Sequence, residues 1–286
     1  MKIIFIGTAE FGIPSLEKLI AKNYQILAVV TSVDKKIGRK QILTSSPIKQ
    51  AADKWQVPVL QLEKIRNFKL EISNLQPDLI IVVAYGQILP KSILDLPKFG
   101  CINIHPSLLP KYRGPSPIQT AILNGDLETG TTLMLMDEQI DHGPIISQKK
   151  TAILEDETGQ TLHNKLAELS ADLLIETLPD ILADKINPKA QNDKKATYTK
   201  ILTRDDGELD FSKKAQELER QIRAFYPWPG TWIMLNDKRL KILKAEVANS
   251  SDHRAFATSE NYLLPEIVQP EGKRKMSWED FLRGTK

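Results

Sequence analysis

Residues 79–106 read LIIVVAYGQILPKSILDLPKFGCINIHP and contain two apolar runs, Leu79–Ala84 and Cys101–Ile104. A strand that is apolar on both faces is typical of a parallel sheet covered by helices on both sides. The second run stops at His105, and Pro106 cannot extend a strand ladder. These residues therefore predict two buried neighbouring strands, the second of which ends in polar side chains.

Similar runs at Lys2–Ile6 and Ile26–Thr31 alternate with helical patterns, of which the amphipathic stretch at 159–184 is the longest. Buried strands that alternate with helices indicate an α/β fold. We expect a Rossmann-like, doubly wound and mostly parallel sheet over residues 1–185.

The remainder of the chain has a different pattern. Residues 185–200, KINPKAQNDKKATYTK, hold five lysines and one aspartate, which suggests a basic linker over 186–202. Short strand-like segments at 231–235, 240–247 and 263–268 follow a helical stretch. The sequence therefore predicts a small β-rich domain over residues 203–286.

Composition narrows the class of protein. The chain has 286 residues, 26% of them charged, and a net charge of +3, which by itself does not indicate nucleic-acid binding. No apolar run approaches the ~20 residues that span a bilayer, and the N-terminal run followed by a glycine turn does not resemble a signal peptide. The single cysteine excludes an internal disulfide. We expect a cytoplasmic protein without membrane contact.

Asn103 and His105 lie on the same face of their strand because side chains alternate. Ligands of open parallel sheets bind at the carboxyl ends of the strands. There a carboxamide can donate to a developing oxyanion, and an imidazole can donate or carry a proton near neutral pH. The alternative is an Asn and a His that bond only to nearby backbone.

A loop of acids, MDEQIDHGPI at 136–145, could complete this site. A carboxylate near His105 would orient its ring and stabilise the protonated form. Spacing does not decide among Asp137, Glu138 and Asp141, and a solvated polar loop is the simpler interpretation.

Other chemistries find less support. Four scattered histidines and one cysteine form no zinc motif, so we expect no metal. Cys101 could be a nucleophile near His105, although a buried, inert thiol is more common. The turn GTAEFG lacks the spacing of a dinucleotide-binding loop.

Three separated motifs resemble the folate-dependent formyltransferases: N-x-H-P-S-L-L-P-x-Y-R-G-x-x-P at 103–117, D-x-x-T-G-T-T at 126–132, and M-D-x-x-x-D-x-G-P-I at 136–145. Within that superfamily the chain resembles, almost end to end, the branch that formylates methionyl-tRNA. Residues 34–49 are similar to its tRNA-contacting loop, and 222–232 and 269–284 are similar to its OB-like C-terminal domain. That domain is shortened here between Val247 and Leu263.

The resemblance implies that a formyl group passes from 10-formyltetrahydrofolate to the α-amine of methionyl initiator tRNA. It implies Asn103, His105 and Asp141 as the catalytic residues. The implied folate pocket follows the strand at 79–84 and the one that ends at His105: Tyr85, Gly86, Gln87, Ile88, Leu89, Ser107, Leu108, Leu109 and Pro110. An ordinary strand-to-loop turn is the alternative for the first five.

Basic residues in three segments would contact the tRNA: Lys35, Lys36, Arg39, Lys40, Lys194, Lys195, Lys273, Arg274 and Lys275. Solvated loops are the simpler interpretation of each segment taken alone. An amino-sugar nucleotide as the acceptor and a non-catalytic RNA- or folate-binding protein are the rival functions. We expect a monomer.

Overall fold

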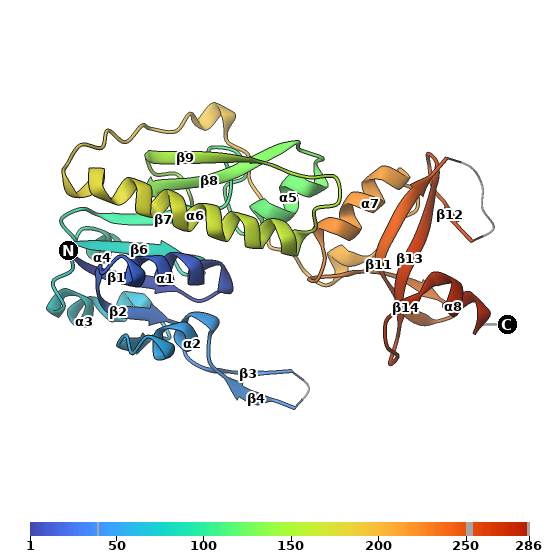
Figure 1. Cartoon of the computed structure of the whole chain (residues 1–286), viewed down its shortest axis with the longest axis horizontal. Helices are drawn as coiled ribbons and strands as arrows, with labels where there is room; N and C mark the ends of the chain where they lie inside the picture. The colour runs from blue at the N-terminus through green and yellow to red at the C-terminus, as the bar shows by residue number, and fades with distance from the viewer. Residues whose placement is uncertain (39, 250–253, 285–286) are drawn as a thin grey trace. The chain divides into compact units, whose positions relative to one another are not determined.

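The computed structural model describes residues 1–38, 40–249 and 254–284 and divides the chain into two compact units (Figure 1). The first unit comprises Met1–Gly114, Gly130–Thr151 and Asn164–Tyr198, and the second comprises Pro115–Thr129, Ala152–His163 and Thr199–Lys286. Both units are therefore built from segments that are not contiguous in the sequence.

A seven-stranded sheet of order β5-β2-β1-β6-β7-β8-β9 forms the centre of the first unit. β1 is parallel to β2 and β6, β6 is parallel to β7, and β7 is antiparallel to β8. The predicted doubly wound, mostly parallel sheet is confirmed. The strands are β1 Lys2–Gly7, β2 Gln25–Thr31, β5 Val59–Gln61, β6 Leu79–Val83, β7 Cys101–His105, β8 Glu128–Leu135 and β9 Ile145–Ala152.

The helices begin where local chemistry predicts. Ser46 caps α2 because its side-chain oxygen accepts from the Lys49 amide at 3.2 Å, and Pro47 occupies the first helical position. The helical elements of this unit are η1 Glu10–Gly12, α1 Ile13–Ala21, α2 Pro47–Lys54, η2 Ile65–Asn67, α3 Lys69–Asn74, α4 Lys91–Leu94 and η3 Asp193–Lys195, together with most of α6, Gly159–Leu182, whose residues up to His163 belong to the second unit.

The basic segment near residue 40 forms a two-stranded antiparallel sheet, which sequence patterns alone did not predict. Its strands are β3, Lys35–Ile37, and β4, Ile42–Thr44. On β4, Ile42 is 60% exposed and Leu43 is 65% exposed. We call residues 35–44 the basic hairpin.

The second basic segment packs into the first unit. The backbone of Lys189 exchanges two hydrogen bonds of 2.8 Å with Ile145, at the start of β9. The Thr197 carbonyl accepts from the Arg113 amide at 2.8 Å, and the Thr197 hydroxyl accepts from the Tyr112 amide, also at 2.8 Å. We call residues 189–198 the strap.

The second unit contains a five-stranded sheet in which β10, β11, β13 and β12 are neighbours in that order and β14 also pairs with β13. Its strands are β10 Thr231–Leu235, β11 Lys238–Ala248, β12 Phe256–Ala257, β13 Tyr262–Pro270 and β14 Met276–Ser277. Its helical elements are α5 Pro117–Leu123, η4 Asp205–Gly207, α7 Ala215–Ala224 and α8 Trp278–Arg283. Residues 250–253, within the segment predicted to be shortened, lie outside the described residues.

Segments that are distant in the sequence pack on α7 within this unit. α5 contacts α7, and Arg223 on α7 donates to the Glu157 carbonyl at 2.9 Å. A side chain added at Gly159 would clash with the Ala224 carbonyl, so only glycine allows this approach. A cavity of about 770 Å³ lies beside α7 and β11.

Within the described residues, no helix is both long enough and apolar enough to cross a membrane.

Candidate active site

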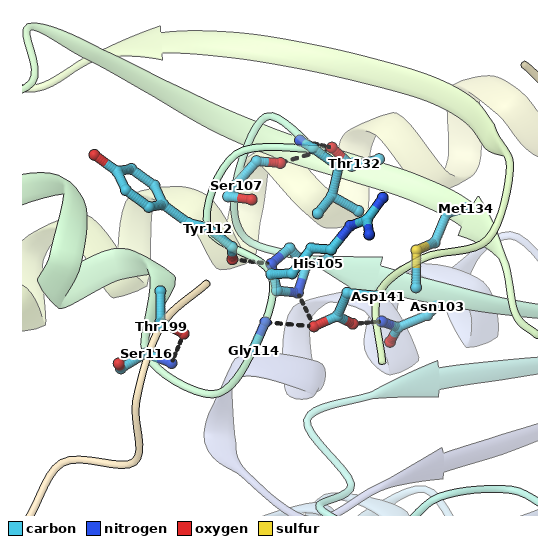
Figure 2. Close-up of polar contacts among 12 residues, drawn as sticks. Asn103, His105, Ser107, Tyr112, Gly114, Ser116, Thr132, Met134, Asp141 and Thr199 are labelled. Atoms are coloured by element: carbon cyan, nitrogen blue, oxygen red, sulfur yellow. Dashed lines mark hydrogen bonds and ion pairs between the residues drawn. The ribbon is translucent and has the colours of Figure 1, made fainter. Parts of the chain in front are cut away.

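The site is built on the end of β7. Asn103 and His105 both belong to this strand, and they pair with Met134 and Thr132 on β8. The His105 side chain is only 5% exposed. As the alternation of side chains predicts, the two polar groups point to one side of the sheet (Figure 2).

The third predicted residue meets both of them. Asn103 Nδ2 donates to Asp141 Oδ1 at 3.1 Å, and His105 Nδ1 lies 3.5 Å from Asp141 Oδ2. The Gly114 amide donates to the same Oδ2 at 2.8 Å, so the carboxylate is held from three sides (Figure 2). Of the three acids in the loop, Asp141 is therefore the one that the structure brings to Asn103 and His105.

The other two acids lie elsewhere. Asp137 Oδ2 is 2.5 Å from His142 Nδ1, and His142 Nε2 is 3.5 Å from Asp193 Oδ2 on the strap. Glu138 is exposed. The hydrogen bond that His142 donates to the Asp137 carboxylate raises the pKa of His142 above its ordinary value, and the charges of Asp137 and Asp193 act in the same direction.

The tautomer of His105 follows from its partners. Nε2 is 2.9 Å from the Tyr112 carbonyl oxygen, which can only accept, so Nε2 carries a hydrogen. Nδ1 is then the nitrogen that faces Asp141. A proton gained or lost by this ring at the site is therefore gained or lost at Nδ1.

Cys101, two residues before Asn103 on β7, is the inert thiol that buried cysteines usually are. Burial raises its pKa to about 12, and its sulfur contacts the Ile93 and Leu94 carbonyls at 3.9 and 3.8 Å. Among the described residues, no cluster of His, Cys, Asp or Glu is arranged to hold a metal ion.

The first predicted wall of the folate pocket follows β6. Tyr85 and Leu89 are buried, whereas Ile88 is exposed. The Gln87 side chain accepts from the Ile65 amide and donates to the Glu63 carbonyl, both at 3.1 Å, which fixes the segment. Gly86 has a φ of +77°, which glycine adopts without strain. The Tyr85 hydroxyl is buried without a hydrogen-bond partner among the described residues, and the ring packs in the hydrophobic core of the first unit.

The second predicted wall is tied to β8. The Ser107 carbonyl accepts from the Thr132 hydroxyl at 2.6 Å, and the Leu109 amide donates to the same hydroxyl at 3.2 Å. Leu108 packs against Gly130 on β8, and Pro110 follows a cis peptide bond. Since the sheet order is β6-β7-β8, the two walls flank the end of β7.

Sequence reasoning missed three groups that shape the site: the Tyr112 carbonyl, the Gly114 amide and the Gln191 side chain. The first two belong to the motif at 103–117, so its length was the available signal. Gln191 lies on the strap, and nothing in a lysine-rich segment distinguished it. Its Nε2 donates to the carbonyls of Asp141 at 2.9 Å and Gly143 at 2.8 Å.

The predicted tRNA-binding residues are distributed over three exposed places. Lys35 and Lys36 lie on the basic hairpin with Lys40, whereas Arg39 is outside the described residues. Lys194 and Lys195 belong to η3 of the strap. Lys273, Arg274 and Lys275 lie between β13 and β14 of the second unit.

Comparison with known families agrees with this architecture. The Formyl transferase family model matches residues 1–178, and the model of the Formyl transferase C-terminal domain matches residues 201–286. The fold is therefore that of a formyl-transferring enzyme.

Similar proteins narrow the class further. A methionyl-tRNA formyltransferase of Caldanaerobacter subterraneus subsp. tengcongensis is 44% identical, and the match covers 99% of this chain and 97% of that protein. One from Bacillus subtilis is 42% identical, over 99% of this chain and 94% of that protein. The chain belongs to the methionyl-tRNA formyltransferase family, which confirms the resemblance seen in its motifs.

Solved structures support the fold. An N-formyltransferase from Helicobacter canadensis, in complex with folinic acid and dTDP-3-aminofucose, has a TM-score of 0.71 at 21% identity and covers 96% of this chain and 100% of its own. HypX from Aquifex aeolicus, in complex with tetrahydrofolic acid, has a TM-score of 0.66 at 16% identity and covers 99% of this chain and 47% of its own.

Proposed function

We propose that this protein transfers the formyl group of 10-formyltetrahydrofolate to the α-amine of methionyl initiator tRNA, with Asn103, His105 and Asp141 as the catalytic residues. The observation that carries the proposal is the hydrogen-bonded contact of Asp141 with Asn103 at the end of β7. Family membership supplies the reaction, and the contact supplies residues that can perform it.

Asn103 is suited to stabilise the oxygen of the formyl group as the amine attacks. A carboxamide carries two N–H donors, and within the described residues one donor of Asn103 is engaged, by Asp141. The other can donate to negative charge that develops on the formyl oxygen. One such donor is typically worth about 10²–10³ in rate.

His105 and Asp141 are suited to move the proton that the amine must lose. The Tyr112 carbonyl holds Nε2, so Nδ1 and the Asp141 carboxylate form the acceptor pair. The Gly114 amide and the Asn103 carboxamide both donate to the Asp141 carboxylate and fix its orientation. Asp141 would orient the ring and accept or relay the proton, either directly or through a water molecule.

The folate would bind between the two walls that flank β7. The exposed Ile88 offers an apolar contact, and the main-chain N–H and C=O groups of the segment that follows β6 offer polar ones. These features fit a ligand with both polar edges and a flat ring. The residues we assign to this pocket remain Tyr85, Gly86, Gln87, Ile88, Leu89, Ser107, Leu108, Leu109 and Pro110.

The tRNA would contact the lysines and arginines of the basic hairpin, the strap and the turn before β14. Exposed cations that follow a phosphate backbone give binding that weakens steeply with salt. We retain the division into a catalytic domain at 1–185, a basic linker at 186–202 and an OB-like, tRNA-binding domain at 203–286 as part of this proposal, and we expect a cytoplasmic monomer.

The first test is to incubate the purified protein with 10-formyltetrahydrofolate and methionyl initiator tRNA and to measure formylmethionyl-tRNA over time. We expect Asn103→Ala to lower turnover about 10²–10³-fold. Asn74→Ala, which removes an exposed carboxamide at the end of α3, is the matched control and should have no effect.

Full turnover by Asn103→Ala would overturn the assignment of the catalytic strand. Absence of product, with the folate still bound in an equilibrium titration, would instead move the acceptor to another amine. An amino-sugar nucleotide would then be tried first.

A further inference from the structure

The loop that presents Asp141 needs support from outside itself. Asp141 has a φ of +49°, a left-handed conformation that is unfavourable for a residue with a side chain. Such a conformation persists only where surrounding contacts hold it. The loop ends at Gly143, where any side chain would clash with the Leu135 carbonyl at the end of β8.

Gln191 supplies a contact on the backbone of this loop. Its Nε2 donates to the carbonyl oxygens of Asp141 and Gly143 at 2.9 and 2.8 Å. These are the residues on either side of His142. One side chain therefore spans the left-handed residue and the tight turn that follows it.

Arg113 holds the other end of the same carboxamide. Gln191 Oε1 accepts from Arg113 Nε at 3.1 Å and from Nη2 at 2.9 Å. The orientation of the carboxamide is unambiguous, since two carbonyls require its donors and a guanidinium requires its acceptor. Arg113 is itself 2% exposed and also binds Asp193 at 2.8 Å.

The loop at 112–114 and Gln191 together contact both the main chain and the carboxylate of Asp141. Arg113 immediately precedes Gly114, whose amide donates to Asp141 Oδ2 at 2.8 Å. The loop at 112–114 thus holds Asp141 twice, directly at the carboxylate and, through Gln191, at the main-chain carbonyl. Without Gln191 the direct bond would remain, but the backbone that carries the carboxylate would lose its second attachment.

We propose that Gln191 is a positioning residue for formyl transfer, which fixes the backbone of Asp141 so that its carboxylate faces Asn103 and His105. This inference rests on the proposed role of Asp141. It gives the strap a function at the reacting groups, in addition to any contact of its lysines with tRNA.

The decisive variant is Gln191→Glu, which keeps the size of the side chain and an acceptor for Arg113 but replaces the two donors by an oxygen facing two carbonyls. We expect kcat to fall about 10–100-fold, because a misplacement near 1 Å can cost that much, while KM for the folate and for the tRNA stays within about threefold. Gln191→Ala should give a similar loss. Asn192→Ala, on the neighbouring residue, is the control and should have no effect on kcat.

A double-variant comparison separates positioning from general stability. If Gln191 acts through Asp141, adding Gln191→Ala to Asp141→Asn should lower kcat no further. Unchanged kcat in Gln191→Glu, or losses that multiply in the double variant, would overturn the inference. Full activity in Asp141→Asn alone would instead reject the proposed role of Asp141, so the two failures are distinguishable.

Thermal unfolding of each variant completes the test. Variants that retain the wild-type Tm and yet lose kcat support positioning. A loss of kcat that appears only at temperatures where the variant unfolds would overturn it.

Discussion

The basic hairpin and the strap have the same signature in the sequence, since both are short segments rich in lysine, yet their structures differ. The hairpin is a two-stranded sheet with exposed apolar side chains on β4. The strap is hydrogen-bonded to residues 110–113 of the motif at 103–117, to the loop of Asp141 and to the start of β9. Both segments present lysines to solvent, whereas the contacts of Gln191, Asp193 and Thr197 hold the strap in the first unit.

This comparison predicts that variants at the contacts between Arg113 and the strap change stability or kcat, whereas variants of the hairpin change only the interaction with tRNA. The largest effect is expected where the strap is anchored. Arg113→Ala would remove a buried side chain and leave Gln191 Oε1 without its donors. We expect the free energy of unfolding to fall by about 2–4 kcal/mol, as measured by urea denaturation.

Lys36→Ala on the hairpin is the counterpart and should change that free energy by less than about 0.5 kcal/mol. Equal decreases in the free energy of unfolding of the two variants would show that the contacts of the strap do not stabilise the protein more than those of the hairpin.

A smaller effect, on a different quantity, is expected at the hairpin. Neutralising Lys35, Lys36 and Lys40 by glutamine should weaken tRNA binding and reduce the slope of log affinity against log salt by roughly 2, since each lost phosphate contact removes about 0.7–0.9. The measurement is tRNA binding between about 50 and 200 mM salt. The same change at Lys22, Lys64 and Lys98, exposed lysines of the first unit, is the charge-matched control. An equal change of slope in the control would show that the effect comes from the net charge of the protein and not from contacts of the hairpin with phosphates.

The smallest effect is a pH dependence of the strap. His142 lies between Asp137 and Asp193, and its pKa in the folded protein is raised. A raised folded pKa adds stability that is fully present below the unfolded value of about 6.5 and is lost as pH rises through the folded value. We expect the free energy of unfolding to decline over this window in the wild type and to decline less in His142→Gln. Identical pH profiles would show that the ion pairs contribute nothing.

Much of the fold and part of the site were predictable because they follow from local pattern. Continuous apolar runs predicted β1, β2, β6 and β7, and the break at Pro106 located His105 at a strand end. The choice of Asp141 over Asp137 and Glu138 was not predictable from spacing, because it depends on a left-handed turn and on the Gly114 amide. It came from resemblance alone.

Longer-range partners could not be predicted at all. Gln191 is 50 residues from Asp141 in the sequence, and a carboxamide among lysines has no pattern that indicates hydrogen bonds to distant carbonyls. The hairpin was missed for another reason. Its three-residue strands are too short for an alternation to be visible, and their lysines suggested a solvated loop.

The noncontiguous composition of the second unit limits how it can be exchanged between proteins. α5 and the stretch before α6 belong to this unit, and both pack on α7. In the sequence, α5 precedes α7 by about a hundred residues, and the stretch before α6 precedes it by about sixty. A fragment that begins at Thr199 would therefore lack part of its own interior. A gene fusion that moved only that fragment onto another enzyme would expose the apolar face of α7. A chimera made with a single crossover is therefore not expected to fold. Residues 115–129 and 152–163 must be transferred together with the C-terminal fragment.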